Sequence, residues 1–115
     1  MKNLAILFLL LATPAQAEPL TLICKGKNGD IDMVPGVAIL DLDKLTFKPP
    51  WLGVISSING VTDTEIWFRF KDEMIYVYGT LDRVSGRVAY STYWPDASPD
   101  TSSQVGVCKP AKPLF

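Results

Sequence analysis

Apolar and polar residues alternate at every second position in short segments of this chain, and that pattern restricts its fold more than any other feature. It is clearest at positions 65–70, where Ile66, Phe68 and Phe70 would share one side of an extended strand and the residues between them the other. Similar runs, bounded by Gly, Pro, Asn and Asp, recur about every eight to twelve residues. Apolar residues nowhere repeat at helical spacing over a helical length. The chain is therefore expected to be all-β.

Turn-forming residues divide the chain into these segments. Strands are expected over positions 20–25, 37–42, 45–48, 51 or 52 to 58, 65–70, 74–84, 87–93 and 105–109. Pro49 and Pro50 each lack an amide donor and should interrupt a ladder, and Asn59-Gly60 predicts a tight turn. The segment 94–103, rich in Pro, Asp, Ser and Thr, predicts a surface loop.

The two cysteines stand near the two ends of this pattern. Cys24 lies in the first expected strand and Cys108 in the last, and in an oxidising compartment such a pair most simply forms one disulfide. Seven to eight short antiparallel strands predict a small barrel-like or sandwich domain closed by that bond. The barrel-like form is slightly favoured, because a disulfide between both ends of the chain suits a sheet that closes on itself.

The first 17 residues have the pattern of a cleavable signal peptide. Lys2 precedes an apolar run over positions 4–12, and the small residues Ala15 and Ala17 follow. Cleavage is expected after Ala17, which leaves residues 18–115 as a single β domain in the periplasm or secreted medium. A membrane anchor is not favoured, since spanning the hydrocarbon layer takes roughly 20 apolar residues.

Composition excludes several classes of function. The net charge is −1 and no basic cluster occurs, so nucleic acid and anionic membranes are poor partners. The chain has no histidine, so serine or cysteine triads and imidazole metal sites cannot be built in their usual forms. We expect a protein that is not an enzyme and that uses no cofactor.

Carboxylate pairs are the remaining route to catalysis. Asp41 and Asp43 project from the same side of one expected strand, and Asp30 and Asp32 repeat that spacing, as the two acids of a glycosidase site could. Such pairs close to turns are typically solvated surface charges, and no catalytic residue is predicted from them.

One spacing imitates the start of a calcium-binding loop. Asn28, Asp30 and Asp32 match its first alternating oxygen ligands, but Met33 stands where the loop needs glycine and Ile39 where it needs a bidentate glutamate. No metal site is predicted.

Two segments carry a resemblance to known exported proteins. Thr80-Leu81-Asp82-Arg83-Val84-Ser85-Gly86, together with the closing Cys108-Lys109-Pro110-Ala111-Lys112-Pro113-Leu114-Phe115, resembles an uncharacterised family of small exported bacterial proteins. The resemblance covers the C-terminal half and implies no activity. The residues themselves predict a hairpin corner at Ser85-Gly86, where glycine supplies the backbone freedom; display of a binding site on that hairpin is the alternative.

A second resemblance is to the periplasmic inhibitors of C-type lysozyme, small exported β-barrels with a cysteine near each end. Their Ser-Gly element followed by tyrosine is similar to Ser85-Gly86-Arg87-Val88-Ala89-Tyr90. The resemblance implies that Ser85 offers its hydroxyl to a catalytic carboxylate in the enzyme cleft. Tyr90 comes one residue later than in the inhibitors, which in a strand sends it to the opposite face, and the lysine that follows in them has no counterpart between Tyr90 and Cys108.

Aromatic residues gather in the second half of the chain. Trp67 lies on the polar side of its expected strand with Arg69, and Tyr76 and Tyr78 follow on the next strand. Cross-strand packing is one interpretation of these rings. The other is a binding patch, since Trp, Tyr and Arg serve as anchors at interfaces; we predict Trp67, Arg69, Tyr76, Tyr78 and Ser85 as binding residues.

Three functions follow from these observations. The leading hypothesis is an exported, non-catalytic binding module whose partner is a protein, a glycan or a small apolar ligand. The alternatives are a periplasmic inhibitor of C-type lysozyme and a structural, envelope-associated protein without a ligand.

Overall fold

The computed structural model describes residues 18–28, 30–95 and 98–112, and within these ranges all regular secondary structure is β-strand. The predicted signal peptide, residues 1–17, lies outside the described residues. No helix in the described part of the chain has the length and apolarity needed to cross a membrane.

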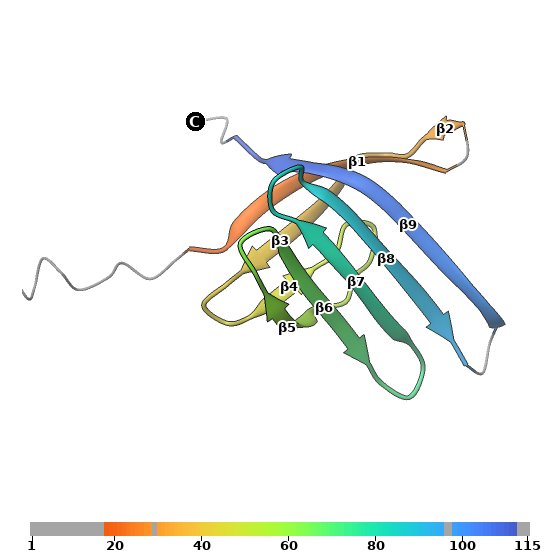
Figure 1. Ribbon diagram of the computed structural model, residues 1–115. Helices are drawn as coiled ribbons and strands as arrows, with labels where there is room; N and C mark the ends of the chain where they lie inside the picture. Colours follow the sequence, from red (N-terminus) through yellow and green to blue (C-terminus); the bar gives the residue numbers. More distant parts are fainter. Residues whose placement is uncertain (1–17, 29, 96–97, 113–115) are drawn as a thin grey trace, which may run out of the picture.

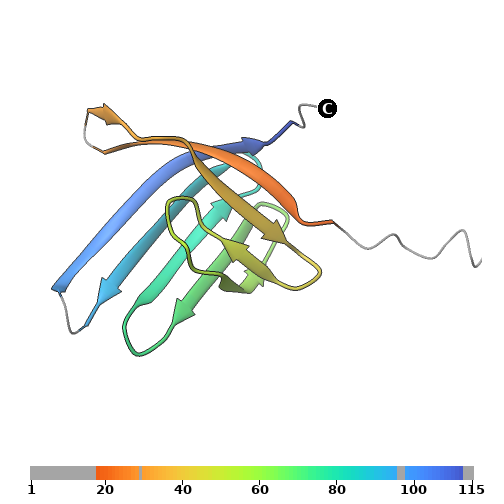
Figure 2. The same cartoon turned by 180° about the vertical axis from the view of Figure 1, so that it is seen from behind.

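Eight antiparallel strands form a closed barrel, as the sequence predicts. The strands are β1 (Leu20–Asn28), β2 (Ile31–Asp32), β3 (Gly36–Asp41), β4 (Thr46–Lys48), β5 (Ser56–Val61), β6 (Glu65–Lys71), β7 (Tyr76–Asp82), β8 (Arg87–Trp94) and β9 (Ser98–Pro110). Pairing runs β1-β3-β4-β5-β6-β7-β8-β9, and β9 returns to pair with β1 (Figure 1, Figure 2). The short β2 pairs with the far end of β1 and projects beyond the barrel.

The seam between the first and last strands carries the predicted disulfide. Cys24 and Cys108 are directly opposed in the β1–β9 register, and their sulfur atoms are bonded. Both side chains face the interior and are buried. The bond therefore fixes the pairing that closes the sheet.

Alternation along each strand fills the barrel. On β6, Ile66 and Phe68 are buried while Trp67 and Arg69 face outward, as the sequence predicts. Phe68 meets Phe47 of β4 across the interior, with ring centroids 4.7 Å apart. The other core side chains come from every remaining strand of the barrel and include Leu22, Ala38, Leu40, Ile58, Val77, Leu81, Val88 and Tyr90.

One end of the barrel is plugged by the segment expected to begin a strand at Trp51. Pro49 and Pro50 are fully buried, and Trp51 has a positive φ of 63°, so the chain leaves the ladder after β4 and residues 51–55 form a loop. The predicted start of this strand at Trp51 or Leu52 was wrong, and β5 begins only at Ser56. The two prolines and the left-handed residue after them turn the backbone across the barrel opening.

The Trp51 ring lies against three glycines, one each in β1, β3 and β9. A Cβ atom added to Gly26, Gly36 or Gly106 would come within 2.8 Å of an atom of this indole. The indole N–H donates to the carbonyl of Val34 at 2.6 Å. Glycines at these positions leave the space that the plug occupies.

Two further predictions were wrong. Asn59-Gly60 is not a turn but part of β5, where the β5–β6 register shifts between Ile58 and Gly60. The predicted loop 94–103 is mostly strand, because β8 continues to Trp94 and β9 begins at Ser98. Residues 101–103 are all exposed, so their sequence does not alternate between apolar and polar residues. Their place in the strand depends on backbone pairing with β8.

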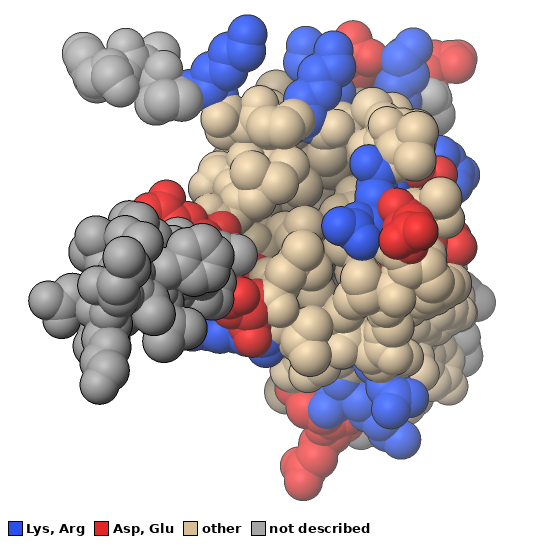
Figure 3. Space-filling model, turned by 60° about the vertical axis from the view of Figure 1, so that its left-hand side comes forward, with Lys and Arg blue, Asp and Glu red and all other residues tan. Residues whose placement is uncertain are grey.

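Charges on the surface are dispersed. Figure 3 shows one side of the molecule, where a broad uncharged area lies between small groups of Lys and Arg side chains. Asp and Glu side chains lie near several of these groups, so recognition on this side would depend on shape and apolar contact more than on one sign of charge.

Removing the disulfide tests its role in closing the barrel. The Cys24→Ser/Cys108→Ser variant should lose about 4 to 5 kcal/mol of unfolding free energy, because the loop it closes is long. Urea unfolding of the variant measures the loss, and wild-type protein unfolded with a reducing agent should match it. A loss below about 1 kcal/mol would contradict this role.

A second substitution tests the plug. Gly36→Ala places a methyl group 2.8 Å from both the Pro50 Cβ and the Trp51 Nε1, and such overpacking should lower the unfolding free energy by about 1 to 3 kcal/mol. Gly53→Ala is the matched control, since no atom lies within 4 Å of the added Cβ, and its stability should be unchanged or raised. Equal effects in urea unfolding would show that the plug is not tightly packed.

Candidate functional site

Four of the five predicted binding residues lie together on the outer surface of the barrel. Trp67 and Arg69 face outward on β6, and Tyr76 and Tyr78 share the same side of β7. Arg69 is directly opposite Tyr78 in the β6–β7 register. The Tyr76 and Tyr78 rings meet edge to face with centroids 5.3 Å apart. We call this surface, defined by Trp67, Arg69, Tyr76 and Tyr78, the aromatic face.

The rings of the aromatic face are accessible from outside. Trp67 is 37% exposed and Tyr78 45% exposed, which are high values for large apolar side chains. The Trp67 ring rests on β5, where a Cβ at Gly60 would lie 2.7 Å from its Cε3 atom. The irregular register at Gly60 and the missing side chain there leave the indole flat against the barrel wall. Its other surface remains available to a partner.

Strand β8 extends the aromatic face with residues absent from the predicted site. Tyr93 is opposite Tyr76, and Ser91 is opposite Tyr78. The Ser91 hydroxyl hydrogen-bonds the Ser103 hydroxyl of β9 at 3.1 Å. The sequence predicts the hairpin that contains Tyr93 and Ser91. Pairing them with Tyr76 and Tyr78 requires the register of β7 and β8, which the structure supplies.

Two open hollows flank the tyrosines. One of about 300 Å³ has Tyr78, Thr80, Ala89, Ser91 and Ser103 among its lining residues. The other, of about 560 Å³, is lined by Ser57, Arg69, Phe70, Lys71 and Tyr76. Tyr76 and Tyr78 thus form a ridge between a largely apolar hollow with hydroxyl groups in its wall and a hollow that carries two cations, Arg69 and Lys71. That shape suits insertion of side chains from a partner.

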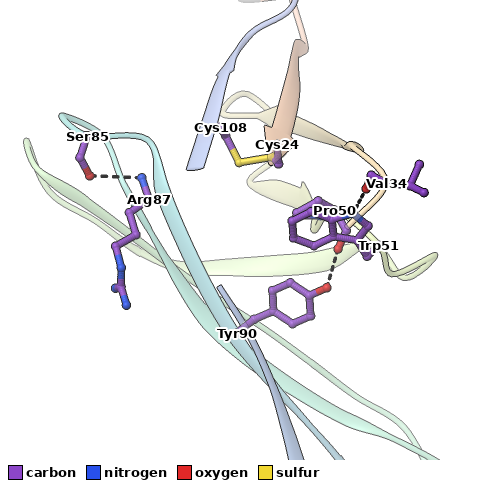
Figure 4. Close-up of a disulfide and its surroundings, with 8 residues drawn as sticks. All are labelled: Cys24, Val34, Pro50, Trp51, Ser85, Arg87, Tyr90 and Cys108. Carbon is purple, nitrogen blue, oxygen red and sulfur yellow. Dashed lines mark hydrogen bonds between the residues drawn. A yellow bond between two sulfur atoms is a disulfide. The ribbon is translucent and has the colours of Figure 1, made fainter. Parts of the chain in front are cut away.

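The fifth predicted residue, Ser85, does not belong to the aromatic face. It is exposed on the turn between β7 and β8, where its hydroxyl accepts a hydrogen bond from the Arg87 amide at 3.2 Å. Figure 4 shows this pair away from Trp51. The turn itself adjoins the strand that carries the disulfide, since the Cys108 amide donates to the Gly86 carbonyl at 2.8 Å. Gly86 has a φ of +79°, which confirms that the corner depends on glycine.

Asp82 organises the same turn. Its carboxylate accepts the amides of Val84 at 2.8 Å and Ser85 at 2.9 Å. The Ser85 amide, followed by the Val84 amide, holds the pKa of Asp82 below its usual range. Arg83 ties the turn to its neighbour, since its guanidinium donates to the Thr62 carbonyl at 2.6 Å. The interactions of Asp82 and Arg83 support the structural interpretation of this motif.

Tyr90 points into the barrel and away from Ser85 (Figure 4). It is 4% exposed, and its hydroxyl donates to the carbonyl of Pro50 in the plug. Burial raises the pKa of Tyr90 to about 12, because the phenolate would lose its hydration. The tyrosine that follows the Ser-Gly element therefore holds the plug in place rather than joining Ser85 at the surface.

Of the acidic residues weighed for chemistry, Asp30, Asp32 and Asp43 are exposed, as expected of solvated surface charges, whereas Asp41 is buried. Asp41 is buried at the end of β3, where its carboxylate accepts the Lys44 amide at 3.0 Å and shapes the turn into β4. Within the described ranges, no three or more Cys, Asp or Glu side chains gather as a group able to hold a metal ion. Among these carboxylates, the hydrogen bond of Asp41 stabilises a turn.

No protein-family model matches this chain, and neither does any curated protein or solved structure.

Alkaline titration tests the burial of Tyr90. Between pH 10 and about 12 the folded protein keeps the Tyr90 proton that the unfolded chain has lost, so the unfolding free energy should fall as pH rises through this range. Tyr90→Phe should remove this part of the pH dependence and the late phenolate absorbance near pH 12. An unchanged ultraviolet titration in Tyr90→Phe would contradict the assignment.

Proposed function

We propose that this chain is an exported, non-catalytic binding module that recognises a partner protein through its aromatic face. The observation that carries the proposal is the exposure of Trp67 and Tyr78 beside Arg69. Large rings of this kind expose apolar surface to water, and a partner that covers this surface gains binding free energy. Trp, Tyr and Arg are also the residues that most often dominate protein interfaces.

The surroundings of the rings favour a protein over other ligands. Tyr side chains next to serines are typical of adaptable protein-binding surfaces, where rigid rings supply contact area and hydroxyls supply hydrogen bonds. Arg69 and Lys71 border one hollow, so we infer that the partner presents an acidic side chain there. Charge complementarity of this kind mainly sets specificity and the association rate.

Export to the periplasm or medium is part of the same proposal. It is supported by the signal-peptide pattern of residues 1–17. The buried Cys24–Cys108 disulfide is compatible with it, since such bonds persist in oxidising compartments.

Inhibition of a C-type lysozyme is the second candidate. Exposure of Ser85 on a tight turn favours it, because the Arg87 amide holds the hydroxyl in place at the surface. The interior position of Tyr90 weighs against a complete match with those inhibitors. A structural envelope protein without a ligand is the third candidate and predicts no saturable partner.

A capture experiment with matched variants tests the leading proposal. Protein purified after expression of the full chain is immobilised and exposed to envelope extract of the source cells, and retained proteins are identified by mass spectrometry. Trp67→Ala/Tyr78→Ala should weaken retention of a specific partner at least about thirtyfold. Val37→Ala/Ile39→Ala is the control, because these exposed residues face outward on β3, three strands from β6 and four from β7 around the barrel.

Further variants separate the candidates. Gly60→Ala should also weaken retention, since the added methyl displaces the Trp67 ring without altering the ring itself. Equal retention by the Trp67→Ala/Tyr78→Ala variant and wild type would contradict the proposal, as would binding that depends on glycans alone. Inhibition of a C-type lysozyme that Ser85→Ala abolishes and Trp67→Ala leaves intact would favour the second candidate.

A further inference from the structure

The barrel end opposite the Trp51 plug is open and apolar. A hollow of about 420 Å³ lies there, within the range of about 300 to 1,000 Å³ common for small-molecule sites. Its wall consists mainly of aliphatic side chains from four strands and one adjoining turn, namely Leu20, Leu22, Leu40, Leu42, Ile66 and Leu81. We call this hollow the mouth.

The depth of the mouth is set by the disulfide seam. Cys108 lines the hollow, while the plug contacts Gly106 two residues earlier on the same strand. Leu22, Leu40 and Leu81 form the buried inner wall, and Leu20 and Leu42 are partly exposed at the entrance. An apolar chain entering here would contact leucines along its length and stop near the disulfide.

The rim of the mouth carries cations that are open to an anion. Arg83 and Lys109 line the hollow, and Asp82 is the acidic residue in the lining. The Asp82 carboxylate already accepts the amides of Val84 and Ser85. Arg83 donates one of its N–H groups to the Thr62 carbonyl, which holds the guanidinium at the rim and leaves other donors for a ligand.

We infer that the mouth is a second binding site, separate from the aromatic face, and that it takes a single-chain amphiphile with an anionic head. The alkyl chain lies among the leucines, and the head group lies at Arg83 and Lys109. Each methylene that enters the hollow should raise the affinity about fourfold, because its apolar surface is removed from water. Affinity should therefore depend on both chain length and head charge.

Calorimetric titration with defined amphiphiles below their micelle concentrations tests this inference, using protein purified after expression of the full chain. Decanoate should bind with one site per barrel and at least about tenfold more tightly than octanoate. Decyltrimethylammonium, which has the same chain and a cationic head, should bind at least about tenfold more weakly than decanoate. Absence of saturable decanoate binding, or equal affinity for the two head groups, would overturn the inference.

Two variants locate the site. Leu42→Asp places a carboxylate at the entrance and should reduce decanoate affinity at least about tenfold. Ile55→Asp is the control, because Ile55 is exposed and does not line the mouth, and it should bind like wild type. Urea unfolding of both variants establishes that they fold. Equal decanoate affinity for the two would place the ligand elsewhere.

The outcome is independent of the aromatic face. Trp67→Ala/Tyr78→Ala should bind decanoate with wild-type affinity, because neither residue lines the mouth. Loss of decanoate binding in this variant would overturn the assignment to the mouth and leave the proposal of a partner protein at the aromatic face untouched.

Discussion

Pairing of the first strand with the last is the constraint on which the rest of this structure depends. Without the β1–β9 ladder the sheet would have two open edges and one face in water, whereas with it the alternating apolar residues of eight strands meet in one interior. The Cys24–Cys108 bond lies within that ladder. It lowers the conformational entropy of the unfolded chain at the contact that is most distant in sequence.

Closure makes the two ends of the barrel different. At one end, three glycines leave space for Trp51, and Tyr90 holds Pro50 above the core. At the other end, leucines of β1 and β3 line an open hollow that no segment among residues 18–28, 30–95 and 98–112 covers. The barrel wall is a third surface, where the exposed Trp67 ring packs against Gly60, at the point where the β5–β6 register shifts. One small core thus supports three chemically distinct surfaces.

The sequence predicted those features whose signal is local or covalent. Alternation in β6 placed Ile66 and Phe68 inside and Trp67 outside, and two cysteines sufficed for the disulfide. Features set by pairing between segments were missed: Asn59-Gly60 resembles a turn, but pairing with β6 keeps it in a strand. The plug could not be foreseen, because Trp51 meets glycines that are distant in sequence. For the same reason the five predicted binding residues do not form one site. Ser85 lies on a turn, whereas the aromatic rings lie on the barrel wall.

Chemical-shift mapping of isotopically labelled protein with its captured partner tests the central claim, recognition through the aromatic face, most directly. The account predicts that amide signals of β6, β7 and the adjoining part of β8 shift on binding, while those of β1 and β3 stay in place. Shifts confined to β1 and β3, or to the turn around Ser85, would contradict it.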